Sequence, residues 1–151
     1  MIDQRRAALE SGNHRGITYG ISHNGMGYRC GYIFLEKGHP WYGKNANELQ
    51  HDGDVCFNCG SHLPIGPLVN TCHGGITWCK EEDEHYVIGF DCAHAGDAAD
   101  PALYPDARPP LAVPWEPEGY EVIRSTEYVR EICLKMCDLA ADARVALGAA
   151  V

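Results

Sequence analysis

Apolar residues recur at every third or fourth position near the end of the chain, from Thr126 to about Leu147. This spacing places one apolar stripe along an amphipathic α-helix, with Ser125 or Thr126 available as its N-cap. Because a helix of this kind must bury its stripe against another element, the rest of the chain has to supply a partner surface. The stripe consists of Val129, Ile132, Cys133, Met136, Leu139, Ala140, Ala143 and Leu147.

Three segments have the composition of β-strands and can form that surface. Residues 28–35 are rich in aromatic and β-branched side chains. Segments 75–79 and 85–92 flank the charged run 80–84, which predicts an antiparallel hairpin. Residues 3–10 are predicted to form a short helical turn capped by an aspartate. The sequence therefore predicts an α+β fold, with a small antiparallel sheet, the C-terminal amphipathic helix packed on one face, and long Gly/Pro-rich loops.

The chain length favours one domain. Its 151 residues lie near the commonest domain size, so we expect residues 1–151 to form a single domain. Segment 95–119 contains six prolines and is predicted to be a Pro-rich loop over the domain, because proline interrupts helices and strands. The net charge of −9 repels phosphate backbones, so non-specific nucleic acid binding is disfavoured.

The location of the protein in the cell is predicted from its apolar segments. No apolar run approaches the ~20 residues that span a bilayer, and the N-terminus lacks the apolar core of a secretory signal. We therefore expect a cytoplasmic protein with no membrane partner. In a reducing compartment, the eight cysteines are expected to be thiols or metal ligands rather than disulfides.

A Cys-x-x-Cys-Gly sequence begins at Cys56 and has the spacing of a zinc knuckle, in which Cys56 and Cys59 chelate one ion. Cys72 and Cys79 lie downstream and would complete a tetrahedral site. Such a closed site predicts structural zinc, because it leaves no open position for catalysis. The alternatives are buried thiols that act as small hydrophobic groups, or a redox pair.

Histidines and aspartates gather at the two ends of the predicted hairpin. The hairpin would bring the start of its first strand beside the end of its second, and so His73 beside Asp91 and His94. Two glycines after His73 allow a backbone to approach a ligand and expose N–H donors. The predicted ligand-binding site therefore consists of His73, Gly74, Gly75, Asp91, His94 and Asp97.

Three kinds of chemistry fit these residue types. They can hold a catalytic metal with an open position, perform acid–base catalysis without a metal, or hydrogen-bond the ribose or phosphate of a nucleotide. The alternative is local: Asp91 and Asp97 cap a turn while the histidines bond backbone carbonyls. The sequence contains no HExxH, serine elbow or phosphate-binding loop that would choose between them.

Lys37 and His39 precede Trp41 and Tyr42 in a second polar string. As outer helpers of the same site, they would present positive charge beside aromatic faces to an anionic ligand. The alternative is a solvated loop whose Trp and Tyr cover the core.

Several strings resemble a family of small proteins encoded by bacteriophages and prophages. The resemblance covers most of the chain from about Tyr28, and it implies phage origin and a common fold but no reaction. Segment 47–71 departs from the family pattern as an inserted excursion that contains the Cys-x-x-Cys. Zinc there would be a local addition, whereas the His73 region would belong to the shared framework. The matching strings are 31–33, 37–43, 73–77 (HGGIT), 89–97 (GFDCAHAGD) and 125–129.

The leading functional hypothesis is a phage-type accessory protein that binds a small, nucleotide-like ligand in the host cytoplasm and captures a host defence signal. The first alternative is a metal-dependent or acid–base hydrolase of a phosphodiester or nucleotide that uses the same His and Asp residues. The second alternative is a protein-interaction module that inhibits a host enzyme through its acidic surface.

Overall fold

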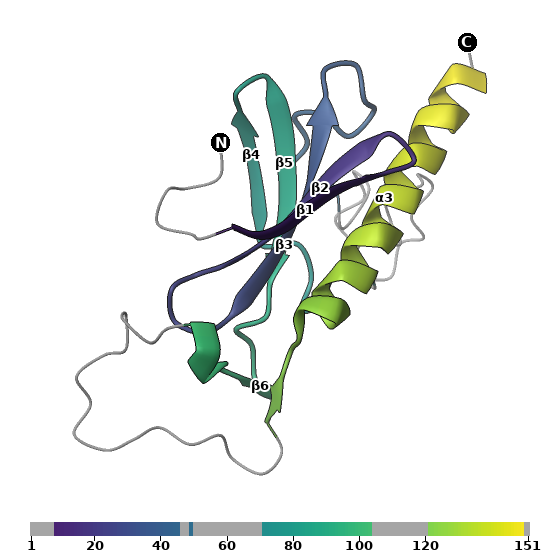
Figure 1. The fold of residues 1–151 in the computed structure, drawn as a ribbon. Helices are drawn as coiled ribbons and strands as arrows, with labels where there is room; N and C mark the ends of the chain where they lie inside the picture. Colours follow the sequence, from purple (N-terminus) through teal and green to yellow (C-terminus); the bar gives the residue numbers. More distant parts are fainter. Residues whose placement is uncertain (1–7, 46–48, 50–70, 104–120, 150–151) are drawn as a thin grey trace, which may run out of the picture.

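A computed structural model describes residues 8–45, 49, 71–103 and 121–149 of the chain. Five strands form one antiparallel sheet in the order β1-β2-β3-β5-β4. A long helix, α3, crosses one face of this sheet and contacts β1, β2 and β3 (Figure 1). The predicted α+β fold is thus confirmed. The elements are β1 (Ala8–His14), β2 (Ile17–His23), β3 (Arg29–Glu36), β4 (Trp78–Glu82), β5 (His85–Asp91) and α3 (Thr126–Ala149).

Within the described residues, three short elements lie between β5 and the helix. β6 (Asp97–Ala98) pairs in parallel with β7 (Val122–Ile123), directly ahead of α3. A 3₁₀ turn, η1 (Pro101–Leu103), follows β6. The start of the predicted Pro-rich loop is therefore ordered by backbone pairing, and its continuation over 104–119 lies outside the described residues.

The first hairpin differs from the sequence prediction. Residues 8–10 belong to β1 and not to a helical turn, while residues 3–7 lie outside the described residues. β1 pairs with β2 around a two-residue turn, Arg15-Gly16, in which both residues have positive φ (54° and 82°). This left-handed turn matches the twist of the strands, and the resulting long-range pairing overrides the weak local helix signal.

The second hairpin is antiparallel, as the sequence predicts. β4 begins at Trp78 rather than at Gly75, and the reversal is the two-residue turn Asp83-Glu84 with φ of 45° and 68°. Most of the charged run 80–84 consequently belongs to β4. β4 is one of the two edge strands of the sheet, where charged side chains reach water and discourage pairing with other chains.

The core lies between α3 and the facing side of the sheet. Ser125 is the N-cap, because its Oγ accepts a hydrogen bond from the Tyr128 amide (3.1 Å). The buried stripe ends earlier than predicted, since Leu147 is exposed. Gly31 lets the helix approach closely: a Cβ there would lie 2.8 Å from Cys133 Sγ. The stripe packs against the buried side chains Ile17, Ile21, Ile33, Leu35, Ile88 and Phe90.

Charged side chains hold the first hairpin on the helix. Arg130 donates two hydrogen bonds to the carboxylate of Glu10 in β1. Arg15 in the turn donates to Asp138 and Asp142 on α3. These partly exposed pairs contribute modestly to stability, but they fix where the hairpin lies along the helix.

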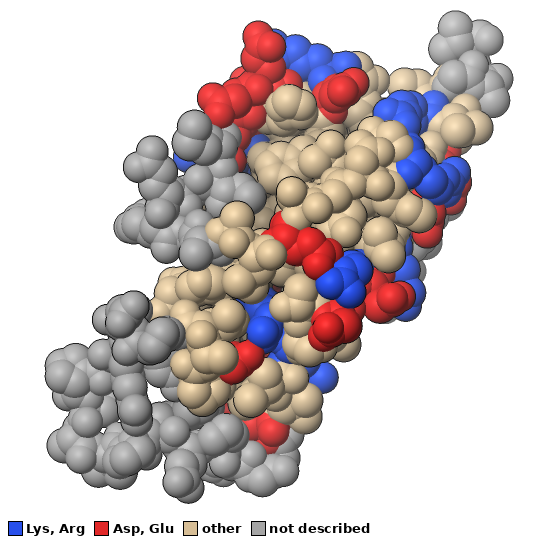
Figure 2. Space-filling model, viewed as in Figure 1, with Lys and Arg blue, Asp and Glu red and all other residues tan. Residues whose placement is uncertain are grey.

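The surface carries both signs of charge. Figure 2 shows acidic side chains gathered over the tip of the β4–β5 hairpin and acidic and basic side chains interleaved along α3. The hairpin group comprises Glu81, Glu82, Asp83 and Glu84. Among the described residues, no helix has the length and apolar character needed to cross a lipid bilayer.

Candidate functional site

Four chain segments meet where β3 begins and β5 ends. Cys30 of β3 pairs with Asp91 at the end of β5, so the chain that follows β5 turns beside the first residues of β3. The amide of Asp97 then bonds the carbonyl of His94 (2.9 Å), and β6 pairs with β7 immediately before α3. Residues far apart in sequence are thereby brought together. We call this group the His73 site: His73, Gly74, Asp91, His94, Asp97, Arg124 and Tyr128.

Asp97 is the buried centre of the His73 site, with a side chain that is 0% exposed. Its carboxylate accepts hydrogen bonds from His73 Nε2 (2.7 Å), from Arg124 Nε (2.8 Å) and from the His94 amide (3.0 Å). Burial alone would raise the pKa of this carboxyl group. The three donors outweigh burial and lower the pKa, so Asp97 is ionised and fixes its partners.

His73 connects Asp97 to an exposed phenol. Because a carboxylate can only accept, His73 Nε2 carries the hydrogen, and the other ring nitrogen, Nδ1, lies 2.8 Å from the Tyr128 hydroxyl, which can donate to it. The two rings meet edge to face, with centroids 5.5 Å apart. The result is a continuous chain from carboxylate to imidazole to phenol, and Tyr128 at its end is 36% exposed.

His94 forms the neighbouring wall, with its ring centroid 5.8 Å from that of His73. Its Nε2 lies 3.3 Å from Asp91 Oδ1. The angles do not suit a hydrogen bond, however, and this buried nitrogen has no hydrogen-bond partner among the described residues. Gly74 lies against the same atom: its φ is +72°, and a Cβ there would be 2.3 Å from His94 Nε2. Glycine is required both by the backbone conformation and by this close approach.

Arg124 supplies the positive charge of the site. Asp97 holds its Nε, and the guanidinium lies over the Tyr128 ring, 5.1 Å from the centroid. Within the described part of the chain, its terminal nitrogens make no hydrogen bond. Arg29 fixes the backbone here, because it donates to the Arg124 carbonyl (2.9 Å) and pairs with Asp100 (2.9 Å).

The residues predicted around the second hairpin are brought together. His73, Asp91, His94 and Asp97 share the site for the reason that the sequence suggested, the antiparallel pairing of β4 with β5. Gly75 differs: it is buried, and its amide donates to the Cys72 carbonyl (3.0 Å), so it shapes the turn and offers no donor to a ligand.

Arg124, Tyr128 and Arg29 were missed by the sequence analysis. The predicted cap at Ser125 places Arg124 and Tyr128 at the start of the helix, but nothing in the sequence places that start beside His73. Arg29 opens a strand of mostly apolar residues, and a charge in such a position is the signal that a partly buried ion pair exists there.

The interpretation of Lys37 and His39 as outer helpers of this site is wrong. They follow β3, whose other end is beside Asp91, and six residues of strand between Cys30 and Glu36 correspond to roughly 20 Å. His39 is buried, accepts the Trp41 amide (3.0 Å) and donates to the Ala140 carbonyl (2.8 Å). Burial lowers the pKa of His39 and keeps it neutral. Trp41 covers the core, as in the alternative interpretation.

The described residues include only two of the four cysteines of the predicted zinc site. Cys56 and Cys59 lie outside the described residues. Cys72 is buried and Cys79 is half-buried, and burial raises the pKa of each thiol to about 12. Among the residues that the structure describes, no group of three or more His, Cys, Asp or Glu side chains is placed to hold a metal ion. Structural zinc on these four cysteines stays a prediction.

Comparison of the chain with protein-family models, with curated proteins and with solved structures found no match. The resemblance to phage proteins therefore stays a prediction as well. Function has to be inferred from the geometry of the His73 site.

Proposed function

We propose that the protein is a phage-type accessory protein that binds a small, nucleotide-like anion at the His73 site in the host cytoplasm. The observation that carries this proposal is the arrangement of Arg124. Its Nε is fixed by the buried carboxylate of Asp97, while its terminal nitrogens have no partner among the described residues. A guanidinium held in this way is ready for two-point binding of a phosphate, and the partly exposed Tyr128 ring beside it offers an aromatic contact for a base.

The charge balance of the site indicates a ligand with few negative charges. Asp97 already neutralises Arg124, and Asp91 adds a negative charge beside His94. Attraction of a triphosphate would therefore be weak, whereas a phosphodiester carries one charge per phosphate and can use the geometry of the guanidinium. A cyclic mononucleotide fits this description, and capture of a host defence signal of that class is the proposed biological role.

Calorimetric titration with 3′,5′-cyclic AMP tests the proposal, with adenosine as the probe that lacks the phosphate. We expect Arg124→Gln to weaken cyclic AMP binding by about tenfold or more, because a charge-assisted hydrogen bond is lost. Lys135→Gln is the matched control, since it removes one positive charge from an exposed position on the same helix. Equal weakening by both variants, or equal affinity for adenosine, would show that Arg124 does not bind the phosphate.

Native mass spectrometry of the purified protein addresses the zinc prediction alongside the ligand. A mass increase of one zinc ion that survives a His73→Ala, His94→Ala double variant and disappears in Cys56→Ser would place zinc on the cysteines. An organic adduct of nucleotide size would identify a captured ligand directly. A protein without any adduct that still binds cyclic AMP would separate the ligand proposal from the zinc prediction.

A second candidate function is acid–base hydrolysis of a phosphodiester, favoured by the chain from Asp97 through His73 to the Tyr128 hydroxyl. This connectivity is that of a carboxylate, an imidazole base and a hydroxyl nucleophile. In such a reaction His73 Nδ1 takes the phenol proton as Tyr128 Oη bonds to phosphorus, and the proton passes to the leaving alkoxide oxygen as its bond to phosphorus breaks. Water then cleaves the tyrosyl phosphodiester.

Bis(p-nitrophenyl) phosphate is a suitable probe for this second candidate. Turnover should be lost in Tyr128→Phe and retained in Tyr42→Phe, a matched control whose hydroxyl bonds Glu81 far from the site (2.6 Å). Turnover that Tyr128→Phe leaves unchanged would exclude the phenol as nucleophile, and absence of turnover in the unaltered protein would leave ligand binding as the function.

A further inference from the structure

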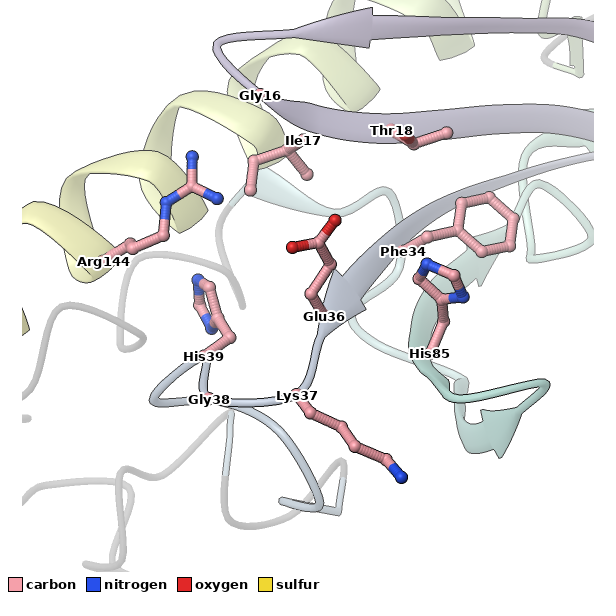
Figure 3. Close-up of a pocket in the computed structure, with 10 residues that line it drawn as sticks. All are labelled: Gly16, Ile17, Thr18, Phe34, Glu36, Lys37, Gly38, His39, His85 and Arg144. Carbon is pink, nitrogen blue, oxygen red and sulfur yellow. The ribbon is translucent and has the colours of Figure 1, made fainter.

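A separate cavity of about 220 Å³ lies at the opposite end of β3 from the His73 site. It is bounded by the β1–β2 turn, by the end of β3 with the loop that follows it, by the start of β5 and by α3 (Figure 3). Ile17 and Phe34 provide apolar wall, and Glu36 and Arg144 provide charge. The walls thus come from five elements that are fixed relative to one another by the fold.

Two opposite charges face this cavity without pairing. The carboxylate of Glu36 points into the space, and the guanidinium of Arg144 enters it from α3 (Figure 3). Arg144 Nη2 is anchored on the Arg15 carbonyl (3.1 Å). Within the described part of the chain, the Glu36 carboxylate forms no hydrogen bond and no ion pair, so the two charges face a common space and are not satisfied by each other.

The other polar residues of the cavity do not compete for these charges. Both ring nitrogens of His39 are used within the protein, one by the Trp41 amide and one by the Ala140 carbonyl. Lys37 directs its ammonium group away from the space between Glu36 and Arg144 (Figure 3). The remaining titratable residue of the lining, His85, bonds the Asp83 carbonyl through Nδ1 (3.2 Å), so Glu36 and Arg144 are the two charged groups directed into the space.

A second recess of about 370 Å³ adjoins the cavity and extends across β1 and β2. The two share Thr18, Phe34 and His85, so one ligand can reach from the charged part into the recess. Phe34 lines both the cavity and the recess, and its aromatic ring favours an apolar group there.

We propose that this cavity binds a small zwitterion, namely a free α-amino acid with an apolar side chain. Its carboxylate would pair with Arg144, its ammonium group with Glu36, and its side chain would lie against Phe34 towards the adjoining recess. The charged part is smaller than the ~300–1,000 Å³ of typical ligand pockets, which suits a metabolite head group. This binding site is independent of the His73 site and of its proposed function.

The test uses L-phenylalanine as the probe and amide NMR shifts as the readout. We expect saturable shifts centred on Gly16 and Gly38, two glycines that line the cavity. N-acetyl-L-phenylalanine lacks the ammonium charge and L-phenylalaninamide lacks the carboxylate, so each should bind about tenfold more weakly or worse. Glu36→Gln should weaken L-phenylalanine binding to a similar extent, whereas Glu131→Gln, at an exposed position on α3, should leave it unchanged.

Three results would overturn the proposal. One is the absence of shifts at Gly16 and Gly38 at millimolar L-phenylalanine. Another is equal binding of both blocked analogues, which would show that the zwitterion is not recognised. The third is equal weakening by Glu36→Gln and Glu131→Gln. Because Glu36 is exposed and its contacts with β5 and His39 are made by the backbone, the side-chain substitution is expected to leave the protein folded, which far-UV circular dichroism checks.

Discussion

Gly74→Ala separates the cost of backbone strain from the role of His94 in the His73 site. Gly74 has φ of +72°, and a Cβ at this position would lie 2.3 Å from His94 Nε2. Gly25 offers a matched control, because its φ is +83° and a Cβ there would meet nothing within 4 Å. Alanine at either position has to adopt a left-handed conformation, but only alanine at residue 74 displaces a neighbour.

The magnitudes follow from these two geometries. The left-handed conformation costs an alanine about 1–2 kcal/mol, so both variants should lose that much free energy of unfolding. In Gly74→Ala the His94 ring must also move by roughly 1 Å to reach ordinary contact distance. The His94 side chain is 33% exposed and can rotate, so this movement adds about 0.5–1.5 kcal/mol, the cost of an unfavourable rotamer.

Urea unfolding followed by tryptophan fluorescence measures the stabilities, and calorimetric titration with cyclic AMP measures binding. We expect the two variants to differ in stability by about 1 kcal/mol but in affinity by about tenfold, since only Gly74→Ala moves His94 from its place beside His73. In a His94→Ala background the stability difference between the two glycine variants should disappear.

The reasoning would be refuted by equal affinities of Gly74→Ala and Gly25→Ala, which would remove His94 from the binding site. A stability difference that persists in the His94→Ala background would show that the alanine meets something other than the ring. Unchanged stability in both variants would contradict the positive φ values themselves.

Asp97→Asn should lower the free energy of unfolding by about 3 kcal/mol in chemical denaturation, because an amide turns its own donors toward those of His73 and the backbone. His39→Gln should reduce the fall in the free energy of unfolding as the pH is lowered. Burial lowers the pKa of His39, so below the ordinary pKa of 6.5 the unfolded chain binds a proton that the folded chain does not. The free energy of unfolding of the unaltered protein therefore falls as the pH falls. A stability–pH slope that is identical in both proteins would contradict this. Gly31→Ala should cost about 1–3 kcal/mol in urea unfolding, since its Cβ would lie 2.6 Å from Phe90 in the core; a neutral result would show that the sheet and helix are less tightly packed there.

The fold could be predicted where the local pattern and the tertiary structure agree. The stripe that begins at Val129 predicts α3, and the charged reversal after Cys79 predicts the second hairpin. β1 and β2 were missed because their strand character depends on pairing around Arg15-Gly16. The sequence near Ala8 favours a helical turn only weakly, and a hairpin that packs on a helix overcomes that preference.

The residues of the candidate site that the second hairpin brings together could be predicted from the sequence. The residues that the start of α3 and the segment before it contribute could not. His73 and Asp91 belong to segments joined by one antiparallel pair, which the sequence reveals. Arg124 and Tyr128 reach the same place through the parallel pairing of two-residue strands, which has no sequence signal. Lys37 was assigned to the wrong site because the polar residues around it do not reveal which end of β3 lies beside the His73 site.

The dependence of the His73 site on tertiary structure has a consequence for how a ligand can be found. Arg29 bonds Thr126, the Arg124 carbonyl and Asp100, so one side chain in the sheet holds together segments that separate when the chain unfolds. A ligand of the site therefore binds the folded chain and not the unfolded one. Mass action then requires it to raise the free energy of unfolding by about 2.7 kcal/mol at a concentration one hundred times its Kd. Because Arg124→Gln removes the proposed phosphate contact while leaving Arg29 on the backbone carbonyl, we expect a nucleotide ligand of the His73 site to stabilise the unaltered protein and not this variant.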